Sequence, residues 1–263
     1  MDQKPTLDVY NQLQRAYDHY NETLFRPAGE MVFPCIITLQ RKNRSYGFAC
    51  RKRFKNRASG QELHELAMNP EYFAVVPLIE ILQTLVHEMA HLWEYDHREP
   101  PDRYHSKAWA NKMESIGLMP SDTGKPGGKR TGQQMADYVI DGGPFMRATE
   151  ALLRQEFRFA WVETRPLQRP VPETYIPPSW SAQLPESDDE EELQGEDDQS
   201  GLVAALYAPM PAAAVATVST DSVKPKATRQ KFICLSCLDA AWGSPLLELA
   251  CLKHGAPVKL VKA

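Results

Sequence analysis

Residues 82–97 read LQTLVHEMAHLWEYDH and place two histidines four positions apart in a largely apolar run. Apolar side chains recur at three- and four-residue spacing, which predicts a buried helix over residues 76–95. On that helix His87 and His91 project from one face, so both imidazoles can bind the same zinc ion. Glu88 points about 100° away around the axis, where it can reach a water on that ion and act as general base. Packing alone does not explain these polar groups, because burying them without partners costs on the order of several kcal/mol.

A catalytic zinc site needs a third protein ligand and an open position for water. His97 follows His91 by six residues, as in the metzincin pattern, but Glu94 stands where that pattern has glycine. Glu114, in the next predicted helix, would give a gluzincin-like site. His105 comes directly after the loop DHREPPDRY, which contains two prolines and is short enough to bring the next helix back beside the first. The residues alone leave all three candidates open.

Periodicity and turn residues predict a mixed order of helices and strands. The predicted elements are a helix over 6–25, a β-hairpin of VFPCIITLQ (32–40) with SYGFACRKRF (45–54), a third strand over 62–68, the motif helix, a helix over 106–117, a strand in ADYVI (136–140) and a helix over 145–160. The third strand is the expected exposed edge on which a substrate strand could pair.

Several stretches resemble the SprT-like family, which includes the bacterial SprT proteins and the eukaryotic DNA-dependent protease Spartan. The matching features are the opening helix, the strand pair, ELAMNP, HEMAH and YHSKAWANKM, which together cover about residues 6–120. The resemblance selects His105 over His97 as the third zinc ligand, beside His87 and His91. It implies that Glu88 is the general base. It also implies a small zincin-like metalloprotease domain with helices packed on a short antiparallel sheet.

The C-terminal segment carries a second metal-binding pattern. FICLSC contains Cys234 and Cys237, and ACLKH contains Cys251 and His254, so a CxxC pair is followed after 13 residues by a CxxH pair. Two such pairs can close a tetrahedral structural zinc site. SprT-like proteins often end in a zinc ribbon, although here His254 replaces the usual last cysteine. The alternative is a tail with free thiols and no metal.

The charge is distributed unevenly along the chain. The net charge is −4, but residues 186–198 hold nine acids and no base, and without them the balance would be +5. A segment of 17 residues has a basic cluster and no acid; its basic members are Arg41, Lys42, Arg44, Arg51, Lys52, Arg53, Lys55 and Arg57. This cluster could contact the phosphate backbone of DNA, or it could be only a solvated hairpin face.

We therefore expect an α+β chain in three parts. These are a SprT-like zinc metallopeptidase domain over 1–164, a disordered Pro-rich and acidic linker over 165–230, and a zinc-ribbon-like module over 231–263. The sequence has no signal-peptide pattern and no apolar run of about 18 residues, so a cytoplasmic location, with nucleoid association as an option, is expected and no membrane partner.

The expected function is zinc-dependent cleavage of proteins bound or crosslinked to DNA, with single-stranded DNA as one option. Tyr104 or Tyr138 could stabilise the oxyanion. Two alternatives stay open: a DNA-binding regulator with an inactive or weakly active SprT-like fold, and a metallopeptidase that does not bind DNA. The substrate protein and the oligomeric state do not follow from the sequence.

Overall fold

The computed structural model describes residues 4–98, 104–165, 170–184, 198–208, 230–244, 248–254 and 258–262. The chain divides into two compact units, 1–216 and 217–263, and each is described by itself. Both combine short strands with turns, and the first adds helices, so the fold is of the mixed α+β kind that we expect from the sequence. Among the described residues, no helix is both long and apolar enough to span a membrane.

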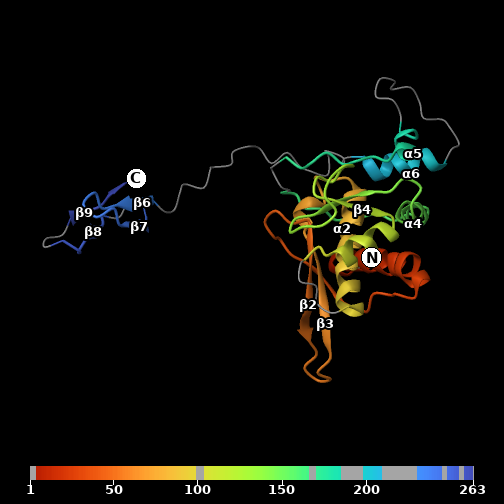
Figure 1. Ribbon diagram of the computed structural model, residues 1–263, viewed down its shortest axis with the longest axis horizontal. Coiled ribbons are helices and arrows are strands. Elements are labelled where there is room, and N and C mark those ends of the chain that lie inside the picture. The colour runs from red at the N-terminus through yellow and green to blue at the C-terminus, as the bar shows by residue number, and fades with distance from the viewer. Residues whose placement is uncertain are drawn as a thin grey trace. The chain divides into compact units, whose positions relative to one another are not determined.

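The first unit contains helices and small sheets (Figure 1). Its helices are α1 (Pro5–Tyr20), α2 (Leu78–His97), α3 (Lys107–Ser115), α4 (Pro144–Leu153), α5 (Pro178–Ser181) and α6 (Asp198–Tyr207), with shorter helical turns η1 (Asn21–Phe25), η2 (Arg26–Ala28) and η3 (Pro70–Tyr72). Its strands are β1 (Ile36–Leu39), β2 (Gly47–Lys55), β3 (Glu62–Met68), β4 (Leu118–Ser121) and β5 (Ala136–Val139).

The main sheet has the order β1-β3-β2. β3 pairs parallel with β1 and antiparallel with β2, so the predicted direct hairpin of β1 with β2 and the predicted all-antiparallel sheet are both wrong. The connection between β1 and β2 passes the end of β3, where the Asn69 side chain donates to the carbonyls of Lys42 (3.1 Å) and Ser45 (2.9 Å). The connection is thus bonded to the end of β3, which lies between β1 and β2.

The predicted third strand is confirmed at residues 62–68, but its predicted place at an edge is wrong. β3 is central, and its last five side chains are all buried. Even the carboxylate of Glu65 is buried there, where it accepts a hydrogen bond from Thr38 (2.8 Å). The free edges of this sheet belong to β1 and β2.

α2 is the central helix of the first unit, and its Ile79, Leu82 and Leu85 are almost fully buried in one hydrophobic core. α1 adds Leu13 and Tyr20 to the same core. Because apolar side chains surround most of α2, its few buried polar groups need specific partners.

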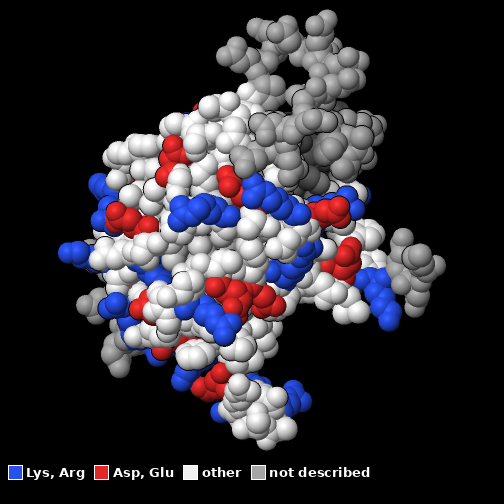
Figure 2. All heavy atoms as spheres, turned by 90° about the vertical axis from the view of Figure 1, so that its right-hand side faces the viewer, with Lys and Arg blue, Asp and Glu red and all other residues white. Residues whose placement is uncertain are grey.

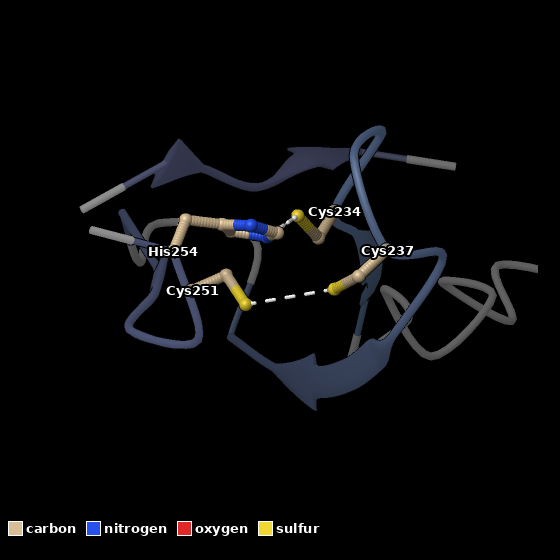
Figure 3. A group of neighbouring side chains, drawn as sticks. All are labelled: Cys234, Cys237, Cys251 and His254. Carbon is tan, nitrogen blue, oxygen red and sulfur yellow. Dashed lines mark hydrogen bonds between the residues drawn. The ribbon is translucent and has the colours of Figure 1, made fainter. Parts of the chain in front are cut away.

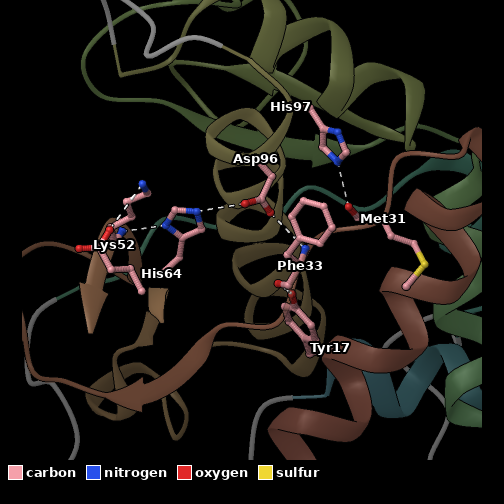
Figure 4. Close-up of polar contacts among 8 residues, drawn as sticks. Tyr17, Met31, Phe33, Lys52, His64, Asp96 and His97 are labelled. Carbon is pink, nitrogen blue, oxygen red and sulfur yellow. Dashed lines mark hydrogen bonds and ion pairs between the residues drawn. The ribbon is translucent and has the colours of Figure 1, made fainter. Parts of the chain in front are cut away.

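The β2–β3 hairpin extends beyond the body of the unit (Figure 1). A bulge interrupts β2 between Cys50 and Phe54, where Lys52 has a positive φ of 48°. The Lys52 backbone N–H donates to Nδ1 of His64 (2.8 Å), and Nε2 of His64 donates to Asp96 on α2 (3.0 Å; Figure 4). The other Asp96 oxygen accepts from the Phe33 N–H (3.1 Å). This network fixes the bulged part of the hairpin to the end of α2.

Part of the expected disordered linker is ordered. Residues 170–184 include α5, whose Trp180 is fully buried and donates to Glu150 (2.8 Å), and α6 buries Leu206. The expectation therefore does not hold for residues 170–184 and 198–208, where aromatic and aliphatic side chains find a surface on the first unit. The rest of the predicted linker lies outside the described residues, apart from residue 165, which ends a bend, and Gln230, which begins strand β6.

The second unit is small and rich in strands. β6 (Gln230–Ile233), β7 (Ala240–Gly243) and β10 (Val261–Lys262) form an antiparallel sheet, and β8 (Ala250–Cys251) pairs with β9 (Val258–Lys259). Phe232 and Leu260 supply a minimal core. So small a core gives little stability without a further constraint such as a bound metal.

Candidate metal centres

His87, His91 and His105 lie together in the first unit, with one nitrogen of each ring within 4.8 Å of the other two. The first two project from α2, and His105 stands two residues before α3. Ser106 fixes the start of α3, because its hydroxyl accepts from the N–H groups of Ala108 and Trp109 (3.1 Å each). The same hydroxyl donates to Glu94 of α2, which holds the two helices together next to the histidines.

Two of the three imidazoles are oriented by acceptors on their Nδ1 atoms. Nδ1 of His87 donates to Oδ2 of Asp137 (2.9 Å), and Nδ1 of His105 donates to the carbonyl of Gly132 (3.1 Å). A carboxylate and a carbonyl can only accept, so both Nδ1 atoms carry the proton and both Nε2 atoms present lone pairs. These two Nε2 atoms face each other at 3.2 Å.

That arrangement fits a metal ion. Two lone pairs at this distance repel each other unless a cation or a proton lies between them. Two nitrogens bound tetrahedrally to one zinc would lie about 3.3 Å apart. Both ring nitrogens of His91 are buried with no hydrogen-bond partner among the described residues. Burial and the two neighbouring histidines hold the pKa of His91 well below its usual value, so it stays neutral and able to bind a cation.

The other two histidines have opposite pKa shifts. Burial, then His87, lowers the pKa of His105 to about 4. Burial also acts to lower the pKa of His87, but the hydrogen bond to Asp137 and the nearby Glu88 outweigh it and raise the pKa. Asp137 thus stabilises positive charge at His87. The same interaction would also favour binding of a cation by His87.

Glu88 is buried next to the three histidines, with 4% of its surface exposed. Burial raises its pKa to about 7, although His87, Lys42 and the backbone amide of Ala49 act in the opposite direction. Gly47 makes this position possible, because a Cβ there would lie 3.2 Å from Cγ of Glu88 and 2.9 Å from Cγ2 of Thr84. The glycine lets β2 approach α2 at the carboxylate.

Of the two tyrosines considered for the oxyanion, only Tyr104 lies in this cluster. Its ring stacks on His91 with centroids 4.2 Å apart, and its side chain hydrogen-bonds with Glu88. Burial and the charge of Glu88 raise the pKa of its hydroxyl, so the hydroxyl keeps its proton. Tyr138 instead contacts Tyr175, with centroids 5.0 Å apart.

The two other candidates for the third ligand are engaged elsewhere. Nε2 of His97 donates to the carbonyl of Met31 (2.9 Å; Figure 4), and Glu114 forms an ion pair with Arg130. The group within reach of one ion therefore contains His105 and neither of these.

The predicted ligands of the second site also converge. Cys234, Cys237, Cys251 and His254 have ligand atoms within 4.8 Å of one another (Figure 3). Sγ of Cys234 lies 3.3 Å from Nε2 of His254, and the sulfurs of the other two lie 3.7 Å apart. Backbone N–H groups, first that of Cys237, lower the pKa of Cys234 to about 6, which favours the thiolate that metals bind.

The predicted basic cluster lies on β2 and in the turns that flank it, but acids neutralise part of it. Arg41 pairs with Glu163, and Lys52 and Lys55 lie 3.5 and 3.8 Å from Glu62. Arg53 lies 3.9 Å from the buried Glu65. Lys42 lies over the ring of Phe48 at 4.3 Å. Within the described part of the chain, Arg44, Arg51 and Arg57 form no ion pair, so they carry most of the free positive charge of the cluster.

The sequence did not point to Asp137 or to the carbonyl of Gly132. Both belong to residues 132–137, the part of the chain whose role the sequence left open. The one available signal was an acid inside the apolar run ADYVI, since a buried acid in a strand needs a partner.

Comparison with known proteins identifies the family of this chain. The SprT-like family model matches residues 13–127, which include all three histidines and Glu88 but end before Asp137. An uncharacterized protein in mucB 3'region of Salmonella typhimurium is 50% identical over 62 residues, which are 24% of this chain and 80% of that protein. No solved structure matches. The chain belongs to the SprT-like family.

Proposed function

We propose that this protein is a zinc-dependent metalloendopeptidase of the SprT-like type. The observation that carries the proposal is the convergence of three imidazole nitrogens, all within 4.8 Å of one another, beside a buried carboxylate, Glu88. The zincin-like arrangement, in which a helix carries HExxH and a following segment carries the third histidine, is proposed on the same grounds.

A zinc ion at His87, His91 and His105 would polarise the substrate carbonyl and make a water acidic enough to attack it. Glu88 accepts the proton of the attacking water and passes it to the leaving amine. A pKa of about 7 suits both transfers near neutral pH. Tyr104 is placed to donate a hydrogen bond to the oxygen on which negative charge develops.

The outer edge of β2 is the proposed place for an extended substrate. The backbone amide of Ala49 faces Glu88 and Tyr104, which puts this edge next to the reacting groups. An added strand could hydrogen-bond to this edge and leave its scissile bond beside the histidines. β3 cannot serve in this way, because both its neighbours are present.

In the second unit, Cys234, Cys237, Cys251 and His254 are the proposed ligands of a structural zinc in a ribbon-like module. All four positions are supplied by the protein, which leaves none for substrate. The ion would stabilise the second unit, whose hydrophobic core is too small to give much stability by itself.

We propose DNA, including single-stranded DNA, as a partner, and proteins bound or crosslinked to it as substrates, in the cytoplasm at the nucleoid. Arg51 and Arg57 on the projecting hairpin, with Arg44 in the connection before it, support this, since a projecting basic element can follow a phosphate backbone. By contrast, lysines and arginines are interspersed with acids on the face shown in Figure 2. That face has no single-sign surface of the kind that attracts nucleic acid.

The test is Glu88→Gln in zinc-loaded protein. Cleavage of an unfolded protein substrate should fall by about 10³-fold or more while the zinc content stays the same, because the change removes the base and no ligand. Glu22→Gln, a change of an exposed acid in an i,i+4 pair with Arg26, is the matched control. Equal cleavage by Glu88→Gln and wild type would contradict the proposal.

A DNA-binding regulator with little or no activity is the second candidate. The free arginines of the hairpin favour it as much as they favour a DNA-dependent peptidase. It predicts salt-sensitive binding of an oligonucleotide that survives Glu88→Gln, and no cleavage with or without single-stranded DNA. A peptidase that ignores DNA would instead cleave equally well in both conditions.

A further inference from the structure

A polar hollow with a volume of about 410 Å³ lies between the end of α2 and one face of α3, and none of His87, His91 and His105 lines it. Its lining residues are Glu30, Trp93, Arg98, Lys107, Ala108, Asn111, Lys112 and Ser115. The five from α3 recur at three- and four-residue spacing, so they form one face of that helix. The opposite face buries Trp109, which contacts the ring of His91 with centroids 5.1 Å apart.

The hollow is positively charged. Three cations, Arg98, Lys107 and Lys112, face one carboxylate, Glu30. Lys112 is buried to 5% exposure, where it donates to Glu30 (2.9 Å) and lies 4.9 and 5.0 Å from the ring centroids of Phe25 and Trp93. Holding an ammonium group out of water is costly, and one partly exposed carboxylate meets only part of that cost.

The two rim cations are exposed and available. Arg98 lies over the ring of Trp93 at 5.3 Å, which orients its guanidinium at the edge of the hollow. Lys107 forms no ion pair with any residue that the structure describes. Asn111 also lines the hollow, and its side-chain amide can donate a hydrogen bond. The other nearby acid, Glu94, does not line the hollow and is held by Ser106.

We propose that this hollow binds a phosphate group. Guanidinium, ammonium and amide donors that converge on one space suit an anion with three or four accepting oxygens better than a carboxylate with two. The volume exceeds what one phosphate needs, so the group can belong to a larger molecule, either a phosphodiester of nucleic acid or a free phosphate compound. This site goes beyond the proposed peptidase function and does not depend on it.

The position also links the hollow to the metal centre. Arg98 ends α2 and Lys107 begins α3, so the rim cations stand at the two ends of the segment that carries His105. An anion held by both would tie the end of α2 to the start of α3, two residues after His105. Phosphate binding should therefore make the zinc ion of wild type more resistant to chelator.

The experiment titrates inorganic phosphate into full-length, zinc-loaded protein by calorimetry at constant ionic strength. We compare wild type, Arg98→Gln with Lys107→Gln, and a control in which Lys4→Gln and Arg158→Gln remove two exposed charges that belong neither to the hollow nor to the basic cluster. Wild type and control should bind phosphate alike, and the rim variant should bind on the order of tenfold more weakly or worse, since two charge-assisted hydrogen bonds are lost. Both rim side chains are exposed, so folding should not suffer.

Equal phosphate binding by wild type and the rim variant would overturn the proposal, because phosphate would then be bound elsewhere, for example at the metal centre. A competition experiment with oligothymidylate identifies the source of the phosphate group. Displacement of phosphate by the oligonucleotide assigns the site to a phosphodiester, and no displacement assigns it to a free phosphate compound. Neither readout uses cleavage, so failure here is separate from failure of the proposed peptidase.

Discussion

Oδ2 of Asp137 lies 2.9 Å from Nδ1 of His87, and only 6% of the Asp137 side chain is exposed. The two residues are 50 positions apart, and the acid lies outside the part of the chain that matches the SprT-like family. The contact sets the tautomer of His87 and points its Nε2 at the other two imidazoles. β5 therefore supplies a supporting residue to the candidate metal centre, whose first two histidines come from α2.

Replacing Asp137 should weaken metal binding. Asp137→Ala leaves His87 free to rotate and to change tautomer, so zinc affinity should fall by about 10- to 100-fold, as expected for a partner of a metal-bound histidine. Asp137→Asn keeps a hydrogen-bond acceptor for Nδ1 of His87, so its zinc affinity should fall less than that of Asp137→Ala. Competition with a chromogenic chelator measures both. If alanine and asparagine gave wild-type affinity, the contact would have no role in metal binding.

Gly47→Ala should lower activity without loss of zinc. Its Cβ would lie 2.9 Å from the Ala67 carbonyl and from Cγ2 of Thr84, so β2 must move away from α2 or displace Glu88. We expect kcat/KM to fall on the order of tenfold or more, because the base loses its position. Gly201→Ala in α6 is the control, since its Cβ meets nothing within 4 Å. The idea fails if both variants cleave like wild type.

Glu80→Gln should stabilise the protein at high pH. Burial raises the pKa of Glu80 from 4.5 to about 7, with Thr174 opposing and Asp137 adding to the shift. Between these values the folded state holds a proton that the unfolded chain has released, so this group makes the stability fall as the pH rises from about 4.5 to 7. Glutamine removes the effect, whose upper bound is about 3 kcal/mol at 1.36 kcal/mol per pKa unit.

Thermal unfolding of wild type and Glu80→Gln at pH 5 and pH 8 checks this prediction. The Tm advantage of the variant should be larger at pH 8. Glu22→Gln controls for the loss of one surface acid. A Tm difference that is the same at both pH values would show that Glu80 does not act through its proton.

Cys251→Ser should remove one metal ion per chain and leave the other. The serine hydroxyl is a poor zinc ligand, and the remaining three groups cannot close a tetrahedral site. The measured metal content should fall from two ions per chain to one. The proposed peptidase activity of the first unit should be retained. Cys35→Ser is the control, because burial raises the pKa of that thiol to about 12 and so disfavours the thiolate. Loss of an ion from the control instead would contradict the assignment.

Several features of the first unit could be read from local sequence. The period of three to four residues located α2, and the β-branched and apolar run located β3, because each pattern arises within one element. The same holds for Ser106, a polar residue at the start of a predicted helix. The members of the two candidate metal-binding groups were also predicted, because each contains closely spaced pairs; His105 was chosen only through the family resemblance.

Other features could not be read in that way. In the order β1-β3-β2, a strand from later in the chain lies between two segments whose spacing suggests a hairpin, and Asn69 at the end of that strand bonds the connection between them. The docking of Trp180 depends on a surface formed by other parts of the chain. The partner of His87 comes from a strand with no recognisable motif.

The sequence by itself determined which residues can bind metal and which helix presents them, because residue chemistry and helical period suffice for that. Only the tertiary structure decided that β2 and not β3 offers the free edge, that Asp137 orients His87, and that cations gather around the hollow beside α3. The reason is physical: these contacts join segments distant along the chain, and their existence depends on how the whole core closes.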